Sequence, residues 1–171
     1  NAYPYNYVTC RQAQTLANNM ESGKYTSSLM FGVQWDLVLK YLETKGTAQA
    51  DLNENSTKWG NYSNNLWNIT NVDSKYYTSS KWTSGAYGTK TSNSIILLST
   101  GASETFCKQG IYDLAGNVWE WTLEKTSDSS GPCVPRGGSC GDAGSYVPAV
   151  DRGGDSTTNY HGTLGFRVSL F

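Results

Sequence analysis

The segment Gly110–Thr122 reads GIYDLAGNVWEWT and combines large apolar side chains with a turn signal. Gly116 and Asn117, in the middle of the segment, are residue types that favour a tight turn. The residues after the turn, Val118–Leu123, are mostly β-branched or aromatic, which favours a strand that is at least half buried. Such a strand needs neighbours, so we expect it to lie between two other strands.

Two later segments are candidates for those neighbours. The first is Arg136–Ser139, with the sequence RGGS. The second is the end of the chain, Gly165–Phe171, with the sequence GFRVSLF, in which apolar and polar residues alternate. A period of two marks a strand with one buried face. The apolar positions of this predicted closing strand are Phe166, Val168 and Leu170.

The motifs GIYDLAGNVWEWT, PRGGS and LGFRVSL stand in the order typical of the formylglycine-generating enzyme and sulfatase-modifying family, which the last third of the chain resembles. That family is a branch of the C-type lectin fold. The resemblance implies an α+β fold with two helices, a small twisted antiparallel sheet and long ordered loops. At 171 residues the chain is long enough for one domain and short for two, so we expect residues 1–171 to form a single domain.

The composition excludes several classes of function. Hydrophobic residues make up 37% of the chain and charged residues 16%, as in a soluble globular protein. The net charge of −1 gives no reason to expect a basic face, so we expect no nucleic-acid partner. No apolar run is long enough to span a bilayer, so we expect no membrane insertion. The chain has no initiator Met and no signal peptide, which indicates a processed product or part of a longer chain.

Two helices are expected near the start of the chain. Thr9 and Gln12 have the spacing of a capping box, in which side chain and backbone satisfy each other's free groups. Apolar residues follow at helical intervals, at Cys10, Ala13, Leu16, Ala17 and Met20. A second helix is predicted over residues 33–43, with an inner face made of Leu37, Val38, Tyr41 and Leu42.

Residues 47–94 are rich in Asn, Ser, Thr and Gly, with scattered aromatic residues. A disordered segment would lack so many large rings. We expect long ordered loops whose rings pin them to the core, while an exposed set of rings that stacks on sugars stays open as an alternative. The rings belong to Trp59, Tyr62, Trp67, Tyr76, Tyr77, Trp82 and Tyr87.

The four cysteines are Cys10, Cys107, Cys133 and Cys140, and they allow three fully paired arrangements. Cys107 and Cys133 bracket the predicted central strand, which makes them the first pair to test. Free thiols packed as small apolar groups remain an equally open alternative.

The family resemblance also implies a calcium ion at the central loop. It would be held by the side chain of Asp113, the carbonyl groups of Gly116 and Val118, and the carboxylate of Glu120. Calcium prefers several hard oxygen ligands on a turning backbone, and this loop offers them. In the alternative interpretation Asp113 caps the turn and Glu120 pairs with a buried arginine, such as Arg136 or Arg167.

Catalysis by this family depends on two cysteines beyond the GGS motif, which bind copper through their thiolates. In this sequence those two positions hold Asp142 and Val147, so no copper is expected. His161 is the only histidine, which leaves no histidine cluster for iron. We therefore expect a protein that keeps the fold without the reaction. An oxidase acting on a substrate cysteine and a calcium-dependent sugar lectin are the alternatives.

The segment from Cys140 to Leu164 reads CGDAGSYVPAVDRGGDSTTNYHGTL and contains no Lys, Glu, Gln, Met or Trp. Every residue type in it can be encoded by a codon that ends in a pyrimidine. That pattern results when the two adenines of AAY codons are randomised, and the chain resembles the variable proteins of diversity-generating retroelements, which vary a C-terminal cassette on this scaffold. The resemblance implies a cassette over residues 136–171; an ordinary glycine-rich loop is the alternative.

The same resemblance implies the ligand-contacting residues of the cassette. Tyr146, Tyr160 and His161 would be the anchors, because rigid rings provide contact area at little entropic cost. Pro148, Ala149, Arg152 and residues 156–158 would be fixed framework. The exposed, exchangeable set would be Cys140, Gly141, Asp142, Ala143, Tyr146, Val147, Val150, Asp151, Gly153, Asp155, Tyr160, His161 and Thr163.

The expected function is therefore non-enzymatic binding of a partner. By resemblance the partner is a cell-surface protein or glycan, and the protein belongs to a phage tail or a bacterial cell surface. The strand through Trp119 and Trp121 would support the contact surface from beneath.

Overall fold

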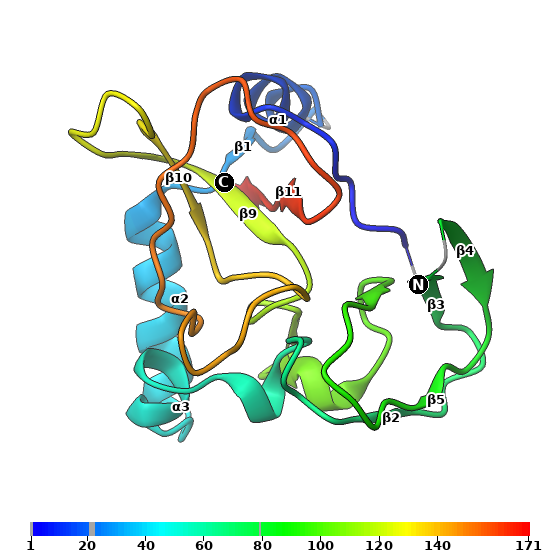
Figure 1. The fold of residues 1–171 in the computed structure, drawn as a ribbon. Helices are drawn as coiled ribbons and strands as arrows, with labels where there is room; N and C mark the ends of the chain where they lie inside the picture. Colours follow the sequence, from blue (N-terminus) through cyan, green and yellow to red (C-terminus); the bar gives the residue numbers. More distant parts are fainter. Residues whose placement is uncertain (1, 21–22, 79) are drawn as a thin grey trace.

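The computed structural model describes residues 2–20, 23–78 and 80–171; residues 1, 21–22 and 79 lie outside the description. The described residues form three α-helices, two short 3-10 helices and twelve short strands (Figure 1). None of these helices is both long and apolar enough to cross a membrane. The α-helices are α1 (Cys10–Asn18), α2 (Gly32–Thr44) and α3 (Gln49–Asn53), and the 3-10 helices are Thr57–Trp59 and Glu104–Phe106.

The strands fall into five small sheets. In chain order they are β1 (Ser27–Leu29), β2 (Asn68–Ile69), β3 (Lys75–Thr78), β4 (Lys81–Ser84), β5 (Gly88–Thr89), β6 (Leu97–Leu98), β7 (Cys107–Lys108), β8 (Ile111–Tyr112), β9 (Trp119–Lys125), β10 (Cys133–Arg136), β11 (Leu164–Phe166) and β12 (Val168–Leu170).

Strand β9 lies between two neighbours, in a sheet with the order β10-β9-β11, which confirms the predicted central strand (Figure 1). Strand β10 is antiparallel to β9, with Arg136 opposite Glu120. Strand β11 is the exception to the predicted antiparallel pairing, because it runs parallel to β9 with Leu164 opposite Trp119. A parallel neighbour requires a crossover connection. The connection from β9 to β11 contains β10 and then residues 137–163, here called the crossover, which pass from one edge of this sheet to the other.

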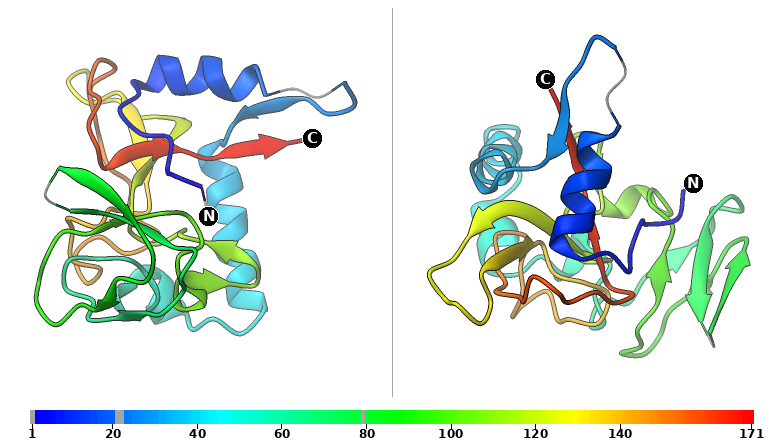
Figure 2. Two further views of the ribbon diagram at one scale, coloured as in Figure 1. Left: turned by 90° about the vertical axis from the view of Figure 1, so that its right-hand side faces the viewer. Right: turned by 90° about the horizontal axis from the view of Figure 1, so that it is seen from above.

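The closing segment forms two short strands instead of one. After β11 the chain leaves the central sheet at Arg167, and β12 then pairs antiparallel with β1, with Leu170 opposite Ser27 (Figure 2). The break frees the Arg167 side chain from the strand, and its guanidinium binds Glu120 on β9. The end of the chain is thereby tied both to the central sheet and to the strand that precedes α2.

Helix α1 begins with the predicted capping box. The backbone N–H of Gln12 donates to Thr9 Oγ1 at 3.2 Å, and the backbone N–H of Thr9 donates to Gln12 Oε1 at 2.9 Å. The buried face of the helix packs against Trp121 and Leu164 of the central sheet. The indole N–H of Trp121 donates to the Val8 carbonyl at 2.9 Å, so this fully buried ring keeps no unsatisfied donor.

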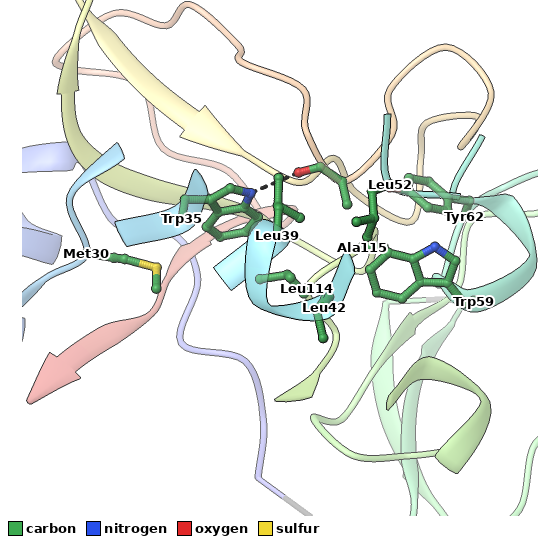
Figure 3. Close-up of a cluster of buried hydrophobic side chains, with 10 residues drawn as sticks. Met30, Trp35, Leu39, Leu42, Leu52, Trp59, Tyr62, Leu114 and Ala115 are labelled. Carbon is green, nitrogen blue, oxygen red and sulfur yellow. Dashed lines mark hydrogen bonds between the residues drawn. The ribbon is translucent and has the colours of Figure 1, made fainter. Parts of the chain in front are cut away.

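Helix α2 was predicted in the right place, but half of its inner face was wrong. Its buried side chains include Trp35, Leu39 and Leu42, which contact α3 and the 114–115 segment in one apolar cluster (Figure 3). Leu37 and Tyr41, predicted to face inward, are 63% and 44% exposed. Apolar residues lie on several faces of this helix, so their periodicity cannot show which face is buried. Packing against the rest of the chain decides it.

The segment 47–94 is ordered wherever it is described, as predicted from its rings. Trp59, Tyr62 and Trp67 are buried. Tyr87 packs edge-to-face against Trp67 and Tyr76, with ring centroids 5.1 and 4.9 Å apart. The segment also contains helix α3 and the β3–β4 hairpin, which the sequence reading missed; the hairpin lies on the opposite side of the molecule from α2 (Figure 2).

Candidate functional site

The crossover starts at the RGGS motif, where two glycines bend the chain away from β10. Gly137 and Gly138 have positive φ angles of 87° and 78°, which side chains rarely adopt. A Cβ atom on Gly137 would lie 2.6 Å from the carbonyl oxygen of Leu114. The phenol of Tyr62 donates to the Gly137 carbonyl at 2.8 Å and holds the turn in place. The motif therefore determines where the crossover begins.

The first half of the crossover is held by side chains of the segment 56–64, which bind its backbone. Ser63 donates from Oγ to the Asp142 carbonyl at 2.7 Å. Asn64 Oδ1 accepts the Gly144 backbone N–H at 3.1 Å. Ser56 Oγ accepts the Ala149 backbone N–H at 2.9 Å. None of these three bonds uses a side chain of the crossover.

The middle of the crossover is held in the same way by Trp35 and Arg136. The Trp35 indole N–H donates to the Ala149 carbonyl at 2.9 Å (Figure 3). The Arg136 guanidinium donates to the Val150 carbonyl at 3.1 Å and to the Asp151 carbonyl at 3.0 Å. Both side chains of this support are fully buried.

The second half of the crossover runs along the outer edge of β10 and returns to β9 (Figure 1). Asp155 exchanges two backbone hydrogen bonds with Cys133, at 2.9 and 3.1 Å, and the Gly153 N–H donates to the Pro135 carbonyl at 3.0 Å. At the far end the Trp119 N–H donates to the Thr163 carbonyl at 2.8 Å. These hydrogen bonds also join backbone groups only, so the side chains of the crossover take no part in them.

An ion-pair network joins the crossover to the framework. Buried Arg136 binds Glu124 of β9 and Asp36 of α2, each at 2.8 Å. Arg152 of the crossover binds the same two carboxylates. Pro148 and Ala149 are buried. That Arg152, Pro148 and Ala149 are framework positions stays a prediction, which these contacts favour. Of the expected framework residues 156–158, Ser156 is half-buried and the other two are exposed.

Two of the predicted exchangeable residues use their side chains locally. Asp142 Oδ2 accepts from the Ser139 N–H at 2.9 Å and from its hydroxyl at 2.7 Å. Asp155 Oδ1 accepts from the Ser156 N–H at 2.8 Å and also binds the Asn159 amide. Other side chains at these two positions would lose these turn contacts. The side chains of His161 and Thr163, also in the exchangeable set, bind each other at 3.0 Å.

A pocket of about 460 Å³ opens between the crossover and the central sheet. Framework residues Trp119, Pro135 and Ser139 form part of its wall. The sequence predicts Trp119 only as support for the contact surface, whereas in the structure its side chain also lines this pocket. Six of the predicted exchangeable residues line the same pocket: Gly141, Asp142, Gly153, Asp155, His161 and Thr163.

The other predicted contact residues lie outside this pocket. Tyr146 and Tyr160 are 85% and 62% exposed, as expected of anchors. Val150 is half-buried and lines a depression beside α2 and α3. Ala143, Val147 and Asp151 are also half-buried.

The prediction that Cys140 is exposed is wrong. Its side chain is fully buried against Leu97 and Val118, and its backbone N–H donates to the Asn117 carbonyl. Burial raises the pKa of the Cys140 thiol to about 12. The position directly after the RGGS turn still points into the core, and the sequence carries no sign of this apart from the small size of the side chain.

A second pocket of about 240 Å³ adjoins the first. Thr163 lines both pockets. The rings of Tyr7, Tyr77 and Trp82 line the second pocket together with Ile95. Two of the rings expected to pin loops to the core therefore also border the crossover.

The central loop places Asp113 and Glu120 in different surroundings. Both oxygens of Glu120 accept from the Arg167 guanidinium at 2.7 Å, as in the alternative that pairs Glu120 with a buried arginine. Asp113 is buried, and its Oδ2 accepts from the Gly101 N–H at 2.9 Å. Its Oδ1 has no hydrogen-bond partner among the described residues.

Arg167 already neutralises Glu120, so of the two carboxylates in the predicted calcium set only Asp113 keeps an oxygen without a partner among the described residues. Calcium binds six to eight oxygen ligands, and one free carboxylate oxygen supplies only one of them. Across the described ranges no three His, Cys, Asp or Glu side chains gather as a metal site would require. The calcium set of Asp113, Gly116, Val118 and Glu120 stays a prediction, which calorimetry with calcium on chelated protein checks.

The buried carboxyl of Asp113 should make stability depend on pH. Burial, reinforced by Glu120, raises the pKa of Asp113 from 3.8 to about 6, although the Gly101 N–H and Arg167 lower it. Because the folded protein holds this proton more tightly than the unfolded chain, the group's contribution to stability falls as the pH rises from about 4 to 6, by up to about 3 kcal/mol.

Asp113→Asn keeps an acceptor for Gly101 but cannot ionise, so its stability should lack this fall. Urea unfolding of both proteins between pH 4 and 7, with chelator present, measures the difference. Parallel stability curves for the two proteins would contradict the assignment.

Comparisons with known proteins agree with this fold. Residues 2–170 match the family described as Sulfatase-modifying factor enzyme 1-like domain. The structure is similar to that of Treponema denticola variable protein 1, with a TM-score of 0.56 and 18% sequence identity, over 95% of this chain and 69% of that chain. None of the curated proteins matches the sequence significantly. The chain is thus a member of the sulfatase-modifying factor enzyme 1-like domain family and has an α+β fold of the C-type lectin type.

Proposed function

We propose that this protein binds a ligand without catalysis, through a contact surface carried by residues 140–163. The observation that carries the proposal is the way the crossover is held. Its carbonyl and N–H groups are bound by side chains of the rest of the protein, namely Trp35, Ser56, Ser63, Asn64 and Arg136. Every residue type except proline has both groups, so most side chains of the crossover can change while these bonds remain.

Exchangeable side chains on a fixed backbone suit recognition better than catalysis. A catalytic site needs particular groups at particular positions, whereas a binding surface needs a rigid support and contact area. Here the support consists of the central sheet and α2. The contact area comes from the pocket beside Trp119 and from the exposed rings of Tyr146, Tyr160 and His161, which would act as anchors.

The chemistry available to the crossover also speaks against an oxidase. The two positions that would hold copper-binding cysteines carry Asp142 and Val147. The one thiol of the segment, Cys140, is buried and has a raised pKa, so it supplies little of the thiolate that copper and nucleophilic chemistry require. Incubation with copper and a sulfatase-type cysteine peptide should leave the peptide thiol intact, and its conversion would favour the oxidase.

The partner we propose is a cell-surface protein or a glycan, bound by a protein of a phage tail or a bacterial surface. This rests on the sequence resemblance to the variable proteins of diversity-generating retroelements. The coding DNA tests it: an adenine-rich near-copy of the segment for residues 136–171 should lie beside a reverse transcriptase gene. A locus with neither would leave an ordinary glycine-rich loop as the better explanation of the composition.

A further inference from the structure

Cys10 and Cys133 are brought together although they lie far apart in the sequence. Cys10 is the first residue of α1, and Cys133 is the first residue of β10. Both are buried in the same apolar cluster, with Trp121 and Leu164. Cys133 lies close enough to Cys10 to contribute, after burial, to the raised pKa of the Cys10 thiol. The core between α1 and the central sheet therefore contains two buried cysteines in one cluster.

The remaining two cysteines are not placed for pairing. Cys107 is half-buried on β7, and Cys140 lies in another cluster with Leu97 and Val118. The predicted first pair, Cys107 with Cys133, is thus replaced by Cys10 with Cys133. All four cysteines lie in the described ranges, and the structure records them as free thiols.

A cation lies beside one of the paired thiols. Lys125 is opposite Cys133 in the β9–β10 register, and its Nζ is 3.3 Å from Cys133 Sγ. Burial, reinforced by the neighbouring Cys133, raises the pKa of Cys10 to about 12. Both observations describe the folded state, in which the two cysteines are buried.

We propose that Cys10 and Cys133 form an intramolecular disulfide when the chain folds in the presence of a disulfide donor, such as oxidised glutathione or a thiol oxidoreductase. The Cys133 thiolate attacks one donor sulfur, and the first donor thiolate leaves. Cys10 then loses its proton to solvent and attacks Cys133 Sγ, which forms the Sγ–Sγ bond and releases the second donor thiolate. Two electrons pass from the two cysteines to the donor disulfide. Because both sulfurs are buried after folding, the exchange takes place before α1 has packed on the sheet.

The bond would link the first helix to the strand from which the crossover departs. It would close a loop containing most of the chain, and such a long loop restricts the unfolded state strongly. Disulfides persist outside the reducing cytoplasm. The inference stands on the cysteine geometry alone, so it holds or fails independently of the proposed binding function.

The experiment refolds the full chain from urea with oxidised glutathione and maps its peptides without reduction. We expect the peptides of Cys10 and Cys133 to be crosslinked, with a mass lower by two hydrogens, while Cys107 and Cys140 react with an alkylating reagent once the refolded protein is denatured. A reductant should lower the melting temperature of the oxidised protein by roughly 10 °C. A crosslink through Cys107 or Cys140, or four thiols that all react when the refolded protein is denatured, would overturn the proposal.

Two variants distinguish loss of the disulfide from other effects of the reductant on the melting temperature. Cys107→Ser removes a thiol outside the pair, so the effect of the reductant should stay. Cys133→Ser removes the bond, so the melting temperature should no longer respond to the reductant. If Cys133→Ser does not fold, the peptide map of the unaltered chain still decides between the two outcomes.

Discussion

Replacing Arg136 with methionine is expected to lower the free energy of unfolding by about 3–5 kcal/mol, which is the usual cost of removing one partner from a buried ion pair. Arg136 is fully buried and supplies two bonds to carboxylates and two to crossover carbonyls. Methionine fills a similar volume but donates none of these bonds. The carbonyl groups of Val150 and Asp151 would lose a charged donor in a buried place.

Arg152 provides the matched control, because it binds the same two carboxylates from the surface. Its side chain is 45% exposed, so Arg152→Met should cost no more than about 1 kcal/mol. Arg136→Lys keeps the positive charge but loses the planar guanidinium with its several N–H donors. We expect its cost in unfolding free energy to lie between those of Arg152→Met and Arg136→Met. Urea unfolding of the three variants gives the comparison. Equal costs for Arg136→Met and Arg152→Met would show that burial and the carbonyl bonds contribute nothing.

Replacing Gly137 with alanine is expected to cost about 3–5 kcal/mol for two separate reasons. Its φ of 87° is strained for alanine, and the new Cβ would lie 2.6 Å from the Leu114 carbonyl and 2.9 Å from the Trp35 ring. Both neighbours are part of the packed core, so neither can move away easily. The turn that starts the crossover would be displaced.

Gly110 serves as a control that separates backbone strain from steric overlap. Its φ is 77°, and a Cβ there would meet nothing within 4 Å. Gly110→Ala should therefore cost only the backbone strain, about 1–2 kcal/mol. The difference between the two alanine variants in chemical unfolding measures the steric part. A cost for Gly110→Ala as large as that for Gly137→Ala would mean that close packing at the RGGS turn is not what requires glycine.

The features that could be predicted from the sequence are mostly local. The capping box at Thr9 and Gln12 needs only the residues around it, and it was found as predicted. The central strand follows from the run after the Gly116–Asn117 turn, and both of its neighbours were expected. The short helix α3, with five residues in a polar segment, carries too little pattern to be recognised.

The features that could not be predicted depend on how distant segments meet. The buried side of α2 is decided by contacts with Leu114 and Ala115, which helical periodicity does not contain. The placement of Cys10 and Cys133 in one buried cluster depends on how α1 packs against the sheet. The division of the exchangeable set into pocket residues, surface rings and the buried Cys140 depends on the path of the crossover.

The central claim is that the framework holds the crossover by its backbone, so that its side chains can be exchanged. A displayed library tests it by randomising positions whose side chains make no bond to the framework: Ala143, Tyr146, Val150, Asp151, Tyr160, His161 and Thr163. A matched library randomises the framework side chains Trp35, Ser56, Asn64 and Arg136. Most clones of the first library should fold, with melting temperatures within about 10 °C of the original protein, and most of the second should not. Widespread unfolding in the first library would contradict the account.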